Sequence, residues 1–180
     1  MDSVNYDSKA AGIRQTAIFG LFFGAAIASR FLLGLRTDTV SILVSFVVLF
    51  LMFWVIPYWF EKYRAIREFK TYKFKIILKF CLPLFLVGAV SSSLVKYYYF
   101  EYMRPAMFAE INDMVVAELN NMNAYPKEKM IDEAMLYVTA ANYAIISGFF
   151  NLLLALPMAL IVRFNFWQRE KMQKFTGRGM

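Results

Sequence analysis

The sequence predicts an all-α, polytopic membrane protein: a bundle of four transmembrane helices with an amphipathic helical loop between the third and the fourth. Of its 180 residues, 60% are hydrophobic and only 18% are charged, whereas soluble domains are usually about 45–50% apolar and about 25% charged. Four apolar runs are long enough to cross a bilayer, whose core takes about 20 helical residues. Because lipid offers the backbone no hydrogen-bond partners, such runs must be helical.

The first two spans lie close together in the sequence. Residues 15–35 form the first span, which is predominantly apolar and carries Arg30 near its far end. Residues 39–60 form the second span, which is rich in Val, Phe and Leu and carries Pro57 near its end. Only a tight turn separates the two, so we expect them to form an antiparallel pair.

The third and fourth spans are separated by a long segment. The third span covers about residues 76–95, with Lys79 at its start, and the fourth covers about residues 136–162, with Pro157 in its second half. With both ends of the chain on the same side, all four spans fit a single transmembrane domain, residues 1–180.

The charges of the loops predict the orientation. The loop 61–75 carries six basic residues and two acidic ones, and the tail 163–180 carries five basic residues. The loop 101–135, by contrast, has seven acidic residues against three basic ones. Since basic segments stay in the cytoplasm, we expect both termini to be cytoplasmic and the loop 101–135 to be extracytoplasmic. Anionic lipids are the expected partners of the basic cytoplasmic surface, and no nucleic acid is expected.

The loop between the third and fourth spans has the pattern of an amphipathic helix. Met107, Ile111, Met114 and Val115 recur at three- and four-residue spacings, and Pro105 suits the first turn. We expect a further helix to begin near Lys127 or Glu128 and to run without a break into the fourth span. The apolar face either lies on the membrane surface or on the bundle, or it forms a cap over a groove or a docking surface for a partner.

The missing residue types exclude most chemistry. The chain has no His and a single Cys, Cys81, so no metal site, no cofactor site and no catalytic set is expected. None of the four spans contains Asp or Glu, which argues against an ion-coupled transporter. The expected protein is therefore not an enzyme.

Basic and aromatic residues gather where the first span ends and the third span leaves the membrane. Arg30, Lys96 and Arg104 are joined there by Tyr98 and Tyr99. In one interpretation the cations reach out to the interface while the aromatic rings anchor the span. In the other, these residues bind an anionic lipid headgroup such as a phosphate or pyrophosphate.

Small and polar residues predict close helix packing. Gly20 and Gly24 are four residues apart, as are Ala144 and Gly148, and such pairs let helix backbones approach. We expect them to pack the helices of one chain, with a homo-oligomer seam as the alternative. Asn151 is expected to join Ser91–Ser93 in hydrogen bonds between helices.

The stretch from Ser91 through Tyr97-Tyr98-Tyr99-Phe100-Glu101-Tyr102-Met103-Arg104-Pro105 resembles the exit of the third span in DUF4199, a family named only as a domain of unknown function. That family is typical of Bacteroidota inner membranes. The resemblance implies four spans, an acidic helical loop, a basic tail and the bacterial inner membrane. The family's gene neighbourhoods imply a membrane-protein partner such as a polyprenyl-phosphate glycosyltransferase.

The leading expectation for function is a non-enzymatic accessory or scaffold subunit of another membrane protein, with lipid-linked glycosylation as the pathway that the resemblance implies. Its docking face would be Met107, Ile111, Met114 and Val115. The alternative is an uncoupled translocator of a lipid or small solute, with Arg30, Lys96 and Arg104 receiving an anionic headgroup.

Overall fold

The computed structural model describes residues 2–36, 38–69, 71–121 and 139–176, and these ranges are helical with no strand. The elements are α1 (Asp2–Gly34), α2 (Thr39–Ile66), α3 (Phe74–Tyr98), the π-helix η1 (Tyr99–Met103), α4 (Pro105–Asn121), α6 (Ala140–Leu153) and α7 (Ala155–Thr176). Four segments are long and apolar enough to cross a membrane: Ala10–Gly34, Thr39–Ile66, Phe74–Met103 and Ala140–Met172. The prediction of an all-α membrane bundle with four spans is confirmed.

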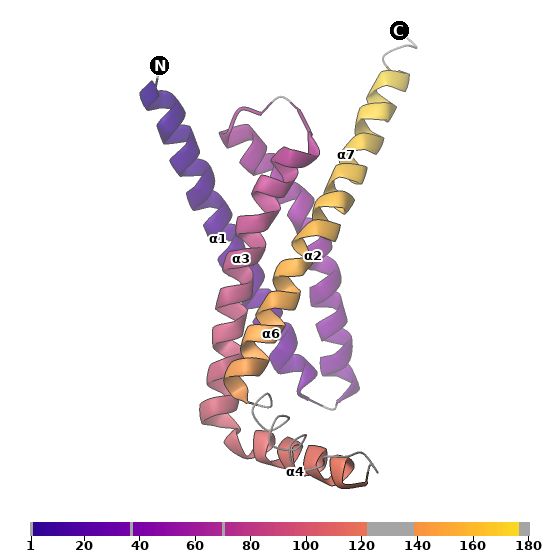
Figure 1. Cartoon of the computed structure of the whole chain (residues 1–180). Coiled ribbons are helices and arrows are strands. Elements are labelled where there is room, and N and C mark those ends of the chain that lie inside the picture. The colour runs from indigo at the N-terminus through magenta and orange to yellow at the C-terminus, as the bar shows by residue number, and fades with distance from the viewer. Residues whose placement is uncertain (1, 37, 70, 122–138, 177–180) are drawn as a thin grey trace.

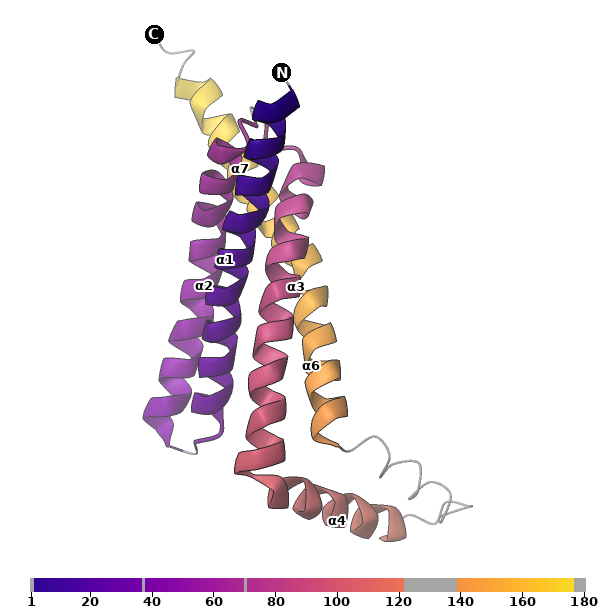
Figure 2. The same cartoon turned by 90° about the vertical axis from the view of Figure 1, so that its left-hand side faces the viewer.

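The four spans run between two ends of the bundle (Figures 1 and 2). Both termini lie at one end, called here the terminal end, and α4 lies crosswise at the other, called the α4 end. Helix α3 is central, because it packs against α1, α6 and α7, while α2 packs mainly against α1. Large apolar side chains cover the outer faces, with Phe50 69% exposed. An apolar exterior of this kind suits a lipid environment.

Helix α2 begins where the sequence predicts but ends later. The Asp38 carboxylate accepts a hydrogen bond of 2.8 Å from the Ser41 N–H and caps the first turn. This bond holds the pKa of Asp38 below its ordinary value. The helix then continues to Ile66 instead of stopping near residue 60. An ion pair three residues apart, Glu61 with Arg64 at 2.9 Å, lies within this extra turn and a half.

The fourth span is broken into two helices. The chain turns at Leu154, between α6 and α7, because Pro157 has no N–H to donate and its ring crowds the carbonyl four residues before it. Thr139 is extended and caps α6 by accepting a hydrogen bond from the Asn142 N–H. The prediction of a helix running without a break into this span is therefore wrong at Thr139. Its expected start near residue 127 lies outside the described residues.

A π-helical turn redirects the chain from α3 into α4. In η1 the Arg104 N–H donates to the Tyr99 carbonyl, five residues back, over 3.0 Å. Phe100 is buried within this turn, and its ring packs against Phe31 at 5.5 Å, Phe108 at 4.8 Å and Tyr143 at 5.1 Å. One aromatic side chain thus fastens α1, α4 and α6 to the end of α3.

Small residues bring α1, α3 and α6 close together. A Cβ built on Gly20 would lie 2.7 Å from Val87 Cβ and 2.9 Å from the Leu84 carbonyl oxygen. A Cβ on Gly148 would lie 2.5 Å from Ser93 Oγ. The predicted use of these glycines, packing within one chain, is confirmed for both contacts.

Candidate functional site

A cavity of about 290 Å³ lies inside the bundle. Residues from α1, α2, α3, α6 and α7 border it, and most are apolar, including Phe23, Met52, Ile56 and Met158. Two polar side chains break this apolar lining: Arg30 from α1 and Asn151 from α6. The cavity therefore offers an apolar space with a cation and an amide in its wall.

Lys96 is buried in the neighbouring wall of the bundle. The residue is only 6% exposed, and its Nζ donates a hydrogen bond to Ser147 Oγ on α6. The ammonium also lies 5.6 Å from the centre of the Phe31 ring. A lysine that reached out to the interface would be exposed at its tip. The first interpretation of these cations therefore does not describe Lys96, whose ammonium is held inside.

Arg30 lies near Lys96 in the bundle, because the next residue of α1, Phe31, has its ring centre 5.6 Å from the Lys96 ammonium. Arg30 belongs to α1 and is exposed, while Lys96 belongs to α3 and is buried. In the described ranges the ion pairs are Glu61 with Arg64 and Arg163 with Glu170, and neither includes these two cations. Two neighbouring like charges repel, so their site favours an anion between them.

Polar side chains of α3 and α6 form a seam beside the cavity. Asn151 Nδ2 donates to Ser92 Oγ over 3.4 Å, and Ser92 Oγ donates to the Ala89 carbonyl. Ser93 Oγ donates to the Ala144 carbonyl over 2.9 Å. The predicted hydrogen bonds between Asn151 and the serine run are confirmed for Ser92, while Ser91 bonds to carbonyls of its own helix. These bonds fix α6 against α3 and so position Ser147 opposite Lys96.

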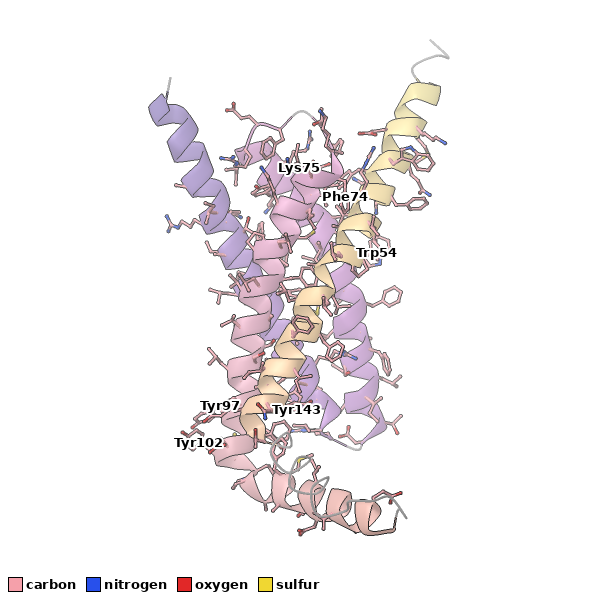
Figure 3. The ribbon with its side chains drawn as sticks, viewed as in Figure 1. Trp54, Phe74, Lys75, Tyr97, Tyr102 and Tyr143 are labelled. Carbon is pink, nitrogen blue, oxygen red and sulfur yellow. The ribbon has the colours of Figure 1, made fainter. Side chains whose placement is uncertain are left out.

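The other residues of the predicted headgroup site take different positions. Arg104 is exposed at the junction of η1 and α4 and does not border the cavity. Tyr98 is also exposed, with its ring 5.1 Å from that of Tyr102. Tyr99 packs edge-on against Phe31 at 5.7 Å, so it supports the ring beneath Lys96. Figure 3 shows Tyr97, Tyr102 and Tyr143 gathered at the α4 end.

The predicted docking face on α4 is partly covered. Met107 and Ile111 are half-buried, whereas Met114 is 64% exposed. The side chain of Val115 lies outside what the structure describes. Phe108 anchors the helix by packing against Phe100 and Tyr143. Beyond this anchor α4 projects away from the bundle (Figure 2), so part of its apolar face remains open.

Sequence reasoning missed three features of the site: Ser147 as the partner of Lys96, Phe31 as the ring beside it, and the contribution of α2 and α7 to the cavity. The first two had a signal, because Phe31 follows Arg30 directly and Ser147 lies next to the small residue Gly148. The third depends on how the helices are placed in space and has no signal in the sequence.

Comparisons with known proteins give one match. A family model described as "Protein of unknown function (DUF4199)" matches residues 17–163. No curated protein and no solved structure matches the chain.

Proposed function

The chain belongs to the DUF4199 family, whose description assigns no function, and we propose from the geometry of the site that it is a non-enzymatic membrane protein that binds an anionic lipid. The negatively charged headgroup would lie between Arg30 and Lys96. A hydrocarbon chain of the lipid would occupy the apolar cavity.

The burial of Lys96 beside a second cation is the observation that carries this proposal. Burying an unpaired charge is costly, and the cost falls when an opposite charge is close. A hydroxyl and an aromatic ring hold the ammonium, but neither neutralises it. A phosphate between Lys96 and Arg30 would convert their repulsion into two charge-assisted contacts.

The apolar lining of the cavity favours a lipid as the ligand over a small polar anion. Ligand pockets are mostly apolar, span about 300–1,000 Å³ and carry a few polar groups that orient the ligand. The cavity here, about 290 Å³ with Arg30 and Asn151 in an apolar wall, is close to the lower limit of that range. One acyl or isoprenoid chain would fit this lining, with its headgroup outside the cavity at Arg30.

Native mass spectrometry in mild detergent tests the proposal. We expect wild-type protein to retain phosphatidylglycerol in preference to phosphatidylcholine. Arg30→Gln should lower the phosphatidylglycerol affinity about tenfold, since it removes a charge-assisted contact. Arg36→Gln is the matched control, because Arg36 is exposed in the turn after α1. Equal retention of the two lipids, or equal losses in the two variants, would contradict the proposal.

An accessory role is the second candidate, and α4 favours it. The helix projects from the bundle with Met114 exposed (Figure 2), so it offers an apolar surface to a membrane-protein partner such as a polyprenyl-phosphate glycosyltransferase. The same mass spectra, taken on protein extracted from its own membrane, would then contain a reproducible protein partner. Translocation has weaker support, because the apolar wall at Met52, Ile56 and Met158 opposes passage of a charged headgroup.

The loop charges support an orientation with both termini in the cytoplasm, and the resemblance to the family implies a bacterial inner membrane. Arg30 and Lys96 would then face the outer leaflet, and α4 would lie outside the cytoplasm. A cysteine at Glu118, in a Cys81→Ala background, should react with an impermeant thiol reagent on intact spheroplasts. Protection until the membrane is opened would reverse the orientation.

A further inference from the structure

A second groove, of about 320 Å³, lies between α2 and α7 towards the terminal end. Its wall carries both signs of charge, Glu61 from α2 and Arg169 from α7, together with the amide of Asn165. Ile161 borders both this groove and the cavity at Arg30. The two spaces therefore share one apolar residue but present different polar groups.

Glu61 is held firmly in the groove wall. Its Oε2 accepts a hydrogen bond of 2.9 Å from Arg64 Nε, and its Oε1 accepts one of 3.0 Å from the Tyr72 hydroxyl. Tyr72 is in turn stacked on Phe166 of α7, with ring centres 4.4 Å apart. Burial is the main cause that raises the pKa of Tyr72, and the hydrogen bond to Glu61 raises it further. A carboxylate accepts about four hydrogen bonds, so Glu61 keeps acceptor positions for a cation in the groove.

Arg169 supplies the opposite charge. Its guanidinium lies over the Phe166 ring, 5.4 Å from the ring centre, and the same ring stacks on Tyr72. A guanidinium that stacks by its face still presents N–H donors at its edge, in a geometry that matches phosphate. Arg169 is thus positioned by the aromatic ring and is able to bind an anion.

Aromatic side chains border the groove in the half of the α2 span nearer the terminal end. Trp54 borders the groove and is 74% exposed. Tyr58 also borders it, and the centre of its ring lies 4.7 Å from the Lys62 ammonium. Trp and Tyr gather at the membrane–water interface. Figure 3 shows Trp54 on this side of the bundle, in the part of the span nearer the terminal end.

We infer that this groove binds a phospholipid whose headgroup is phosphoethanolamine, with the phosphate on Arg169 and the ammonium on Glu61. The lipid belongs to the leaflet at the terminal end, and a chain lies along Pro57 and Ile161. A purely anionic headgroup would bring no N–H donor for the acceptor positions that Glu61 keeps beside its ion pair with Arg64. A choline headgroup carries no N–H to donate to that carboxylate. The inference does not depend on the proposed site at Arg30.

Native mass spectrometry with an equimolar mixture of phosphatidylethanolamine, phosphatidylglycerol and phosphatidylcholine tests the groove. We expect Arg169→Gln to lower phosphatidylethanolamine retention about tenfold while phosphatidylglycerol stays bound. Arg30→Gln should lower phosphatidylglycerol retention and leave phosphatidylethanolamine bound, so a failure of one site can be told from a failure of the other. Lys171→Gln is the matched control, because Lys171 is an exposed cation two residues further along α7 that packs over Trp167 and is not part of the groove wall.

Two further arms complete the test. Glu61→Gln should shift the retained lipid from phosphatidylethanolamine towards phosphatidylglycerol. If the loss of the Glu61 hydrogen bonds prevents this variant from folding, Arg169→Gln alone tests the groove. Glycerophosphoethanolamine, which has the headgroup without acyl chains, should not displace the lipid. Displacement by that soluble compound would overturn the assignment to a lipid. Equal losses from Arg169→Gln and Lys171→Gln, or no preference for phosphatidylethanolamine over phosphatidylcholine in wild type, would overturn the site.

Discussion

Lys96→Met should weaken phosphatidylglycerol binding by about ten- to a hundredfold, the range expected for losing a hydrogen bond to a charged group. The same substitution should leave the bundle as stable as wild type or make it more stable. A buried charge replaced by an apolar side chain of similar length no longer has to be desolvated. Ser147, which accepts the Lys96 hydrogen bond, can turn its hydroxyl to a carbonyl of its own helix.

This combination separates a binding role from a structural one. Lipid affinity is measured by native mass spectrometry and stability by thermal unfolding in the same detergent. Lys79→Met is the matched control, because Lys79 is an exposed cation on the same helix, whereas Lys96 is buried. If Lys96→Met lowered stability and left lipid affinity unchanged, Lys96 would be a structural residue and the proposed site would be wrong.

Gly20→Ala should lower the free energy of unfolding by about 1–3 kcal/mol, the usual cost of forcing extra volume into a packed contact. The new Cβ would lie 2.9 Å from the Leu84 carbonyl oxygen, which is backbone and cannot turn aside. Helices α1 and α3 would have to separate, and the cavity wall between them would shift. The gain in helix propensity from glycine to alanine, about 0.5–1 kcal/mol, is too small to offset this.

The matched control is Gly34→Ala, at the end of the same helix, where an added Cβ meets nothing within 4 Å. We expect it to be neutral or slightly stabilising. Both variants are compared by denaturant unfolding in mixed micelles. Equal stability of the two variants would show that the Gly20 contact does not limit how closely α1 and α3 pack.

The sequence predicts the fold well because the bilayer makes the rules simple. Four apolar runs are long enough to span the bilayer, and a backbone in lipid must form its hydrogen bonds internally, so these runs must be helices. The ends were harder to predict. Helix α2 passes residue 60 because Glu61 and Arg64 are compatible with a further turn, and the break at Leu154 follows from Pro157, whose effect on the path depends on packing.

The candidate site was predictable only in part. Arg30 and Lys96 lie near the ends of the first and third spans, which run in the same direction, so the topology places both residues at the same end of the bundle. Arg104 was grouped with them from its position in the sequence, but the π-helical turn directs the chain into α4 and leaves Arg104 away from the cavity. Periodicity cannot show how one helix is rotated against another, so Ser147 and the α7 part of the cavity wall became visible only in three dimensions.

Photocrosslinking tests the central claim most directly: an anionic lipid lies with its headgroup at Arg30 and its chain in the cavity. The probe is phosphatidylglycerol with a diazirine midway along one acyl chain, and the modified residues are mapped by peptide mass spectrometry. The account predicts crosslinks to Met52, Ile56 and Met158, which border the cavity, and their loss in Arg30→Gln. Crosslinks confined to outward-facing residues such as Phe46, Phe50 and Leu160 would contradict it.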